Sequence, residues 1–212
     1  MKAFNILKFL KYQFYHRLAY LYIDLFKKDN ISYSSNKEDL IIDILTKHKK
    51  KGTYIDIGAY LPDRINNTKK FYERGWRGIN IEPGEKGYEL FKEKRPQDIN
   101  LNIAIGEGEI NFKGYPEVSG NKRRIVLTPL KQIFKDYKLD FVDFISIDVD
   151  RFENEVLKSN DWNQYKAKVL CIEGKGYDGF LKQFGYKKAL FDGTNTYYVL
   201  KNKKSLAFIK KQ

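Results

Sequence analysis

The sequence predicts an α/β fold, a doubly wound, mostly parallel sheet with helices on both of its faces. Three observations lead to this prediction. The chain has 212 residues, enough for one domain with a core of its own. From residue 36 onward, short apolar runs alternate with helical segments. The single cysteine, Cys171, excludes a disulfide framework and a zinc cluster of cysteines, so packing alone must hold the fold and a reducing, cytoplasmic environment is expected.

The first 28 residues predict one long basic helix. Charged side chains interrupt every apolar window long enough to cross a bilayer, and no cleavage site follows an apolar run, so neither a membrane span nor a signal peptide is expected. Three interpretations stay open: packing on the body or in a homodimer, an interfacial helix on an anionic membrane surface at the inner face, and a poorly ordered tail. The apolar stripe of this helix, broken only by Lys11, consists of Phe4, Leu7, Phe14, Leu18, Leu21 and Leu25.

The body begins with a helix over residues 36–50, for which Asn36 is the expected N-cap. Its buried face is expected to hold Leu40, Ile41, Ile44 and Leu45. The next elements are strand 53–57, helix 66–74, strand 78–82, helix 86–94 and strand 99–105. Strands 141–149 and 168–173 follow, and segments 186–191 and 196–200 read as an antiparallel hairpin at one edge of the sheet.

Residues 107–127 interrupt the alternation of strands and helices. Ile110–Phe112 and Ile125–Leu127 are candidates for two short extra strands, joined by a basic loop that contains Lys122, Arg123 and Arg124. Such a loop would overhang the ligand edge of the sheet. Both a solvated surface loop and a contact with substrate are compatible with this composition.

The net charge of +13 is concentrated at the two ends of the chain. Residues 1–28 hold six Lys or Arg and one Asp, and residues 201–212 hold five Lys and no acid. A protein that binds nucleic acid more often carries a basic stripe across its folded body. Nucleic acid is therefore disfavoured as a partner.

Acidic residues end the first two strands of the body. Asp56 precedes Gly58 at the end of the first strand, and Glu82 ends the second. In open parallel sheets ligands bind at the carboxyl ends of the strands, and a carboxylate there accepts hydrogen bonds from two ribose hydroxyls. The turn at Gly58 lacks the three glycines that cradle a pyrophosphate, so a nucleoside with an amino-acid tail, S-adenosylmethionine, fits better than NAD or FAD.

An ordered set of segments across residues 32–173 resembles the FkbM-type S-adenosylmethionine-dependent methyltransferases. These segments are YSSNKED (33–39), YIDIGA (54–59), NT (67–68), FY (71–72), GWRGINIEP (75–83), NIAIG (102–106) and ISIDVDRFE (145–153). The resemblance implies a class I methyltransferase fold with a seven-stranded sheet. It also implies O-methylation of a sugar, a glycan or a small-molecule hydroxyl.

The resemblance also assigns residues to the cofactor. It puts Asp56, Gly58 and Ala59 beside the methionine part and Glu82 at the ribose. It puts Asn102 and Ala104 near the adenine, and Asp148 near the sulfonium and the acceptor. The domain boundaries then follow as a basic amphipathic helix over 1–30, a methyltransferase-like domain over 31–200 and a basic tail over 201–212.

Carboxylates are the expected catalytic groups, because both histidines precede the first strand. Asp148 is the first candidate base, followed by Asp150 and Glu173. Arg151 and Glu173 are expected to contact the acceptor, and no metal ligands are assigned. The family usually has Glu-Gly where Asp150 and Arg151 stand. Three interpretations of Arg151 stay open: its side chain turns outward, it binds an anionic acceptor, or the site is degenerate. The alternative function is therefore a catalytically degenerate fold that serves as a binding or scaffolding module.

Overall fold

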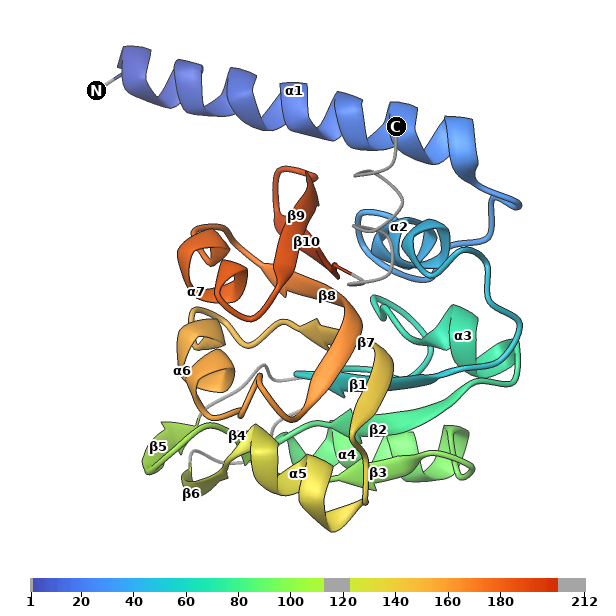
Figure 1. Cartoon of the computed structure of the whole chain (residues 1–212), viewed down its shortest axis with the longest axis vertical. Coiled ribbons are helices and arrows are strands. Elements are labelled where there is room, and N and C mark those ends of the chain that lie inside the picture. Colours follow the sequence, from blue (N-terminus) through green and yellow to red (C-terminus); the bar gives the residue numbers. More distant parts are fainter. Residues whose placement is uncertain (1, 113–122, 202–212) are drawn as a thin grey trace, which may run out of the picture.

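The computed structural model describes residues 2–112 and 123–201. Figure 1 shows a central twisted sheet with helices on both faces and one long helix, α1, across the end of the body. The helices are α1 (Lys2–Phe26), α2 (Glu38–Leu45), α3 (Lys69–Glu73), α4 (Glu85–Lys94), α5 (Leu130–Asp136), α6 (Glu153–Lys158) and α7 (Asp178–Lys182). No described helix combines the length and the apolar character that crossing a membrane requires.

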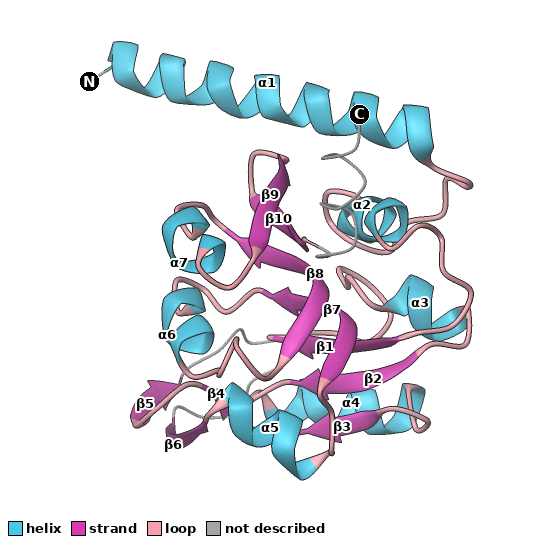
Figure 2. Cartoon of the chain, viewed as in Figure 1, coloured by secondary structure: helices cyan, strands magenta, loops and turns pink. Residues whose placement is uncertain are grey.

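The main sheet has seven strands in the order β3-β2-β1-β7-β8-β10-β9 (Figure 2). All neighbours from β3 to β8 are parallel, and β10 runs antiparallel to both β8 and β9. Strand order reverses between β1 and β7, which creates the switch point where open α/β sheets bind ligands. The seven strands are β1 (Thr53–Ile57), β2 (Arg77–Ile81), β3 (Ile99–Leu101), β7 (Phe141–Ile147), β8 (Lys166–Glu173), β9 (Tyr186–Phe191) and β10 (Asn195–Leu200).

Both faces of the sheet are buried, which explains why its central strands read as nearly continuous apolar runs. Ile55 and Ile145 point to one face, where they pack with α5, α6 and α7. Tyr54 and Phe144 point to the other face, where they pack with α1, α2 and α3. The expected α/β class, the mostly parallel sheet and the C-terminal hairpin are confirmed.

The predicted strand 99–105 is wrong as a single element. It divides into β3 in the main sheet and β4 (Ala104–Ile105) in a small separate sheet, where β4 pairs with β6 (Arg123–Thr128). β6 also pairs with β5 (Glu109–Phe112), so two extra strands do form in the irregular stretch. The residues that join them, 113–122, include Lys122 and lie outside the described part of the chain.

The helix predicted over 36–50 is shorter, and its N-cap differs. Lys37, not Asn36, occupies the cap position, with a left-handed φ of 63° and no capping hydrogen bond from its side chain. The helix ends at Leu45 because Lys47 and His48 also adopt positive φ. The Asn36 side chain instead donates a hydrogen bond to the Glu38 carboxylate.

The apolar stripe predicted for α1 does not face the body. Phe14 and Leu25 are 58% and 67% exposed, whereas Ala19 and Ile23, on the opposite side of the helix, are buried. The helix packs on α2 and on the hairpin through that second side. Of the predicted basic tail, only Lys201 lies within the described residues.

Candidate active site

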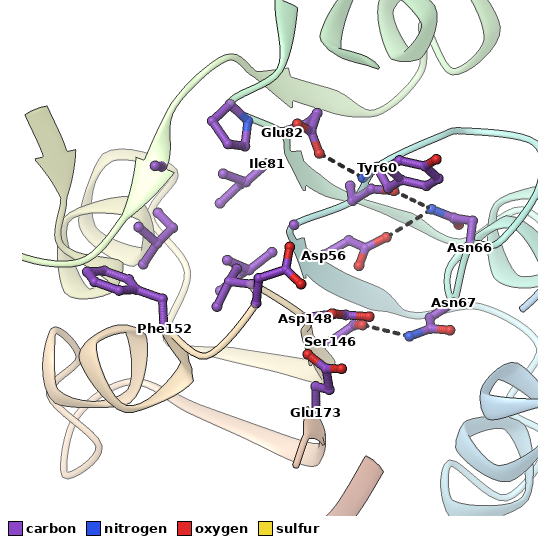
Figure 3. Close-up of a pocket in the computed structure, with 18 of the residues that line it drawn as sticks. Asp56, Tyr60, Asn66, Asn67, Ile81, Glu82, Ser146, Asp148, Phe152 and Glu173 are labelled. Atoms are coloured by element: carbon purple, nitrogen blue, oxygen red, sulfur yellow. Dashed lines mark hydrogen bonds between the residues drawn. The ribbon is translucent and has the colours of Figure 1, made fainter. Parts of the chain in front are cut away.

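A cavity of about 690 Å³ opens at the carboxyl ends of β1, β2 and β7 (Figure 3). Its volume lies within the range of small-molecule sites. The loop after β1, the small sheet and the end of β8 complete its walls. The ends of these strands meet here because parallel neighbours point their carboxyl ends to one edge of the sheet.

The turn at Gly58 brings the first two strand ends together. The backbone N–H groups of Gly58 and Ala59 donate to the carbonyl of Ile81 at 3.0 and 3.1 Å. Gly58 has a φ of +79°, and a Cβ built there would lie 1.9 Å from the carbonyl oxygen of Asp148. Only glycine therefore allows the backbones after β1 and β7 to approach so closely.

Glu82 lies on the same cavity, held by two backbone donors. Its Oε2 accepts from the N–H of Tyr60 at 2.8 Å, and its Oε1 accepts from the N–H of Gly84 at 2.6 Å. Burial raises the pKa of Glu82 to about 7. Each carboxylate oxygen keeps a second lone pair for a ligand hydroxyl.

Asp56 lines the cavity, but its carboxylate accepts hydrogen bonds from the loop that follows β1. It accepts from the Thr68 hydroxyl at 2.9 Å and from the Asn66 amide at 3.3 Å. Arg95, also buried, donates to the Thr68 hydroxyl and to the side-chain oxygen Oδ1 of Asn66, each at 2.7 Å. The burial of Arg95 could not be predicted from the sequence, because a lone Arg directly after a helix carries no local signal of burial.

Asp148 and Glu173 form a carboxyl pair at the ends of β7 and β8 (Figure 3). The two carboxyl groups lie close enough for the charge of Glu173 to act on Asp148. Asp148 is exposed to the cavity, and the protein atoms that crowd its carboxyl group, followed by the nearby Glu173 charge, raise its pKa to about 8. Burial also raises the pKa of Glu173. A carboxylate whose pKa lies near the working pH is suited to accept a proton from a reacting hydroxyl.

The remaining predicted site residues divide into two groups. Ala59, Ala104 and Asp150 line the cavity, whereas Asn102 and Arg151 do not. The Asn102 amide donates to the carbonyls of Glu82 and Pro83 at 2.9 and 3.0 Å, so it supports the loop after β2.

Arg151 lines a second cavity of about 370 Å³ that adjoins the first at Glu173. Its φ of 77° lies in the left-handed region that favours glycine. The backbone thus has the conformation for which the family pattern uses glycine, and the Arg151 side chain leaves the first cavity open. Lys175 is the other cation on the second cavity.

Several further polar residues on the cavity were not predicted as site residues, among them Glu38 and Asn67. Glu38 is buried, and its carboxylate accepts from the Asn195 amide at 3.0 Å, which joins α2 to the hairpin. The Asn67 amide donates to the Ser146 hydroxyl at 3.0 Å. Both residues lie in segments that carry the family resemblance, and that was the only available signal. Within residues 2–112 and 123–201, no group of three or more His, Cys, Asp and Glu side chains could hold a metal ion.

The strand order and the switch-point cavity are those of a class I methyltransferase fold. Residues 113–190 match the family model of the FkbM methyltransferase domain. The match covers about a third of the chain and supports the resemblance to that family. It supports a methyltransferase whose cofactor is S-adenosylmethionine. The cavity fits this cofactor, because the Gly58 turn admits close backbone approach and Glu82 offers acceptors to a ribose. No curated protein matches the sequence.

Several of the solved structures that match are methyltransferases of distant sequence. A precorrin-6y C5,15-methyltransferase from Geobacter metallireducens is 12% identical with a TM-score of 0.46, over 83% of this chain and 94% of that one. A TehB-like SAM-dependent methyltransferase from Corynebacterium glutamicum is 11% identical with a TM-score of 0.43, over 93% and 100%. An O-methyltransferase from Bacillus cereus, in complex with SAH, is 12% identical with a TM-score of 0.39, over 87% and 88%. The strand order and the family match carry the assignment, not these neighbours.

Proposed function

We propose that the chain transfers a methyl group from S-adenosylmethionine to a hydroxyl of a sugar, a glycan or a small molecule. One observation carries the proposal: Glu82, the Gly58 turn and the Asp148–Glu173 pair all face the same cavity. Binding groups for a nucleoside and a candidate base thus share one chamber.

The cofactor residues have distinct roles in this proposal. When bound, S-adenosylmethionine supplies a methyl group already activated by a positively charged sulfur. Gly58 and Ala59 lie against the methionine part, Glu82 accepts hydrogen bonds from the ribose hydroxyls, and Ala104 lies beside the adenine. Asp56 and Asn102 act indirectly, since their side chains hold the loops after β1 and β2.

The acceptor residues lie at the ends of β7 and β8. Asp148 accepts the proton of the acceptor hydroxyl, and Glu173 and Asp150 lie close enough to raise its pKa. The second cavity receives the rest of the acceptor, and its two cations, Arg151 and Lys175, together with its two acids, Glu153 and Glu173, suit an acceptor rich in polar groups. Because Arg151 lies outside the cofactor cavity, it does not favour the degenerate scaffold over an enzyme.

Binding of S-adenosylhomocysteine to wild type and to Glu82→Gln, measured by isothermal titration calorimetry, tests the proposal. We expect the substitution to raise Kd roughly 10- to 100-fold, since hydrogen bonds to a charged group contribute about 1.5–3 kcal/mol. Glu85→Gln is the matched control, because Glu85 is exposed in the first turn of α4. Wild type that fails to bind at millimolar ligand would refute the proposal.

The pH dependence of the same titration is a separate prediction. The pKa of Glu82 is raised to about 7, so the carboxylate that accepts from the ribose is lost as pH falls through neutrality. Wild-type affinity should therefore decrease from pH 8 to pH 6. Glu82→Gln has no proton to gain there, and its affinity should change less. Equal slopes for the two proteins would remove Glu82 from the ribose site.

A further inference from the structure

Helix α1 has two apolar faces, and the body covers only one of them. On the inner face, Ala19 and Ile23 are 2% and 0% exposed and belong to the core shared with α2 and α3. Tyr15 contacts the ring of Phe191 at the end of β9, with ring centroids 5.1 Å apart. These contacts fix the rotation of α1 about its own axis.

The outer face of α1 carries the apolar stripe that the sequence shows. Its side chains follow one another at spacings of four, three and four residues, and Figure 1 shows α1 along the edge of the molecule with its far side turned from the sheet. Large apolar side chains that line up in this way are an uncommon exposed surface. Their exposed fractions are 58% for Phe14, 42% for Leu18, 56% for Leu21 and 67% for Leu25.

Basic side chains flank this outer face on both sides. At 100° per residue, Lys11 and Arg17 project about 60° to either side of Phe14. Both are exposed, and neither forms an ion pair with another described residue. The one acid of the helix, Asp24, pairs with Lys27 at 2.6 Å. The surface thus has an apolar centre, positive flanks and no unpaired negative charge on α1.

We propose that the outer face of α1 binds the surface of an anionic lipid bilayer, with the helix parallel to the membrane plane. The apolar side chains enter the boundary between headgroups and acyl chains, and Lys11 and Arg17 reach the lipid phosphates. A second copy of the chain matches this surface less well. In a pairing of two copies through this face, Lys11 and Arg17 would border the interface with no unpaired acidic counterpart on the facing helix.

Vesicle flotation of the full chain tests this proposal. Wild type should float with vesicles of phosphatidylcholine and phosphatidylglycerol and stay unbound with phosphatidylcholine alone. The triple variant Leu18→Gln, Leu21→Gln, Leu25→Gln should lose at least about ten-fold in vesicle affinity through its lost apolar contact. Lys11→Gln with Arg17→Gln should lose roughly five-fold per charge, and added salt should reduce wild-type binding.

Two control variants distinguish binding through the outer face of α1 from non-specific adsorption to lipid. Val126→Gln with Phe141→Gln removes exposed apolar groups elsewhere, at 69% and 49% exposure, and should bind as wild type does. Lys135→Gln with Lys158→Gln is the charge control, because both lysines are exposed and lie on α5 and α6, which pack on the opposite face of the sheet from α1. Equal thermal melting of all variants shows that they fold.

Several results would overturn the proposal. One is wild type that binds no vesicle, and another is equal flotation with neutral and anionic lipid. Equal binding by wild type and the Leu→Gln variant would also contradict it. Sedimentation velocity tests the alternative occupant. If wild type binds no vesicle and is a dimer, and the Leu→Gln variant is a monomer, the outer face of α1 binds a second copy of the chain.

Discussion

Asp148→Asn is expected to reduce methyl transfer roughly 100- to 10,000-fold, the range that a general base contributes. The amide keeps the shape of the side chain at the end of β7 but cannot accept the proton of an acceptor hydroxyl. Binding of S-adenosylhomocysteine should change much less than turnover. The measurement is transfer of labelled methyl from S-adenosylmethionine to an acceptor on which wild type is active, among sugars, cell-envelope glycans and small-molecule alcohols.

The pH profile distinguishes a base from a structural carboxylate. Because the pKa of Asp148 is raised to about 8, the basic form accumulates and the wild-type rate should rise as pH increases through 8. Stability should move in the opposite direction. A carboxyl group whose pKa is raised on folding favours the folded state when it is protonated, so its contribution is lost as pH rises through the folded pKa. Asp148→Asn should therefore be more stable than wild type at pH 9.

Asp140→Asn is the control for this variant, since Asp140 is exposed at the opposite end of β7. It should leave rate, pH profile and stability unchanged. Asp150→Asn tests the second candidate base. It should reduce the rate less than Asp148→Asn does, because Asp150 acts on the reaction through its charge beside Asp148. If Asp148→Asn kept the wild-type rate and Asp150→Asn lost it, the two roles would be exchanged.

Gly58→Ala should destabilise the fold by about 3 kcal/mol or more and abolish cofactor binding. A left-handed conformation costs a non-glycine residue about 1–2 kcal/mol, and overlap with a backbone carbonyl adds to that cost. The carbonyl oxygen of Asp148, 1.9 Å from the added Cβ, is a main-chain atom directly after β7 and cannot turn aside as a flexible side chain would.

Thermal unfolding measures this effect. A loss of about 3 kcal/mol lowers Tm by roughly 6–12 °C in a chain of this size. Gly179→Ala is the matched control, because Gly179 lies in α7 with nothing within 4 Å of an added Cβ. It should leave stability unchanged or raise it by up to about 1 kcal/mol. Equal Tm values for the two variants would show that the backbones after β1 and β7 are not in close contact.

Much of the candidate site was predictable, because its residues are marked locally and parallel topology collects them. Asp56, Glu82 and Asp148 each stand at or just after the end of an apolar run, and parallel strands place such ends at one edge. The family pattern added Ala104, which no local feature would have singled out. Asn102 was expected at the ligand, yet its amide is taken by two carbonyls of the neighbouring loop.

By itself, the sequence determined the alternation of strands and helices, the edge of the sheet at which the acids gather and the helical character of the first residues. These features depend on periodicity and on chain order. The tertiary structure decided which carboxylates point into the cavity, where the run 99–105 divides between two sheets, and which face of α1 is buried. The apolar stripe of Phe14, Leu18, Leu21 and Leu25 is left exposed because burial depends on the surface that a helix meets. The body presents the hairpin and α2 to the side of α1 that holds Ala19 and Ile23.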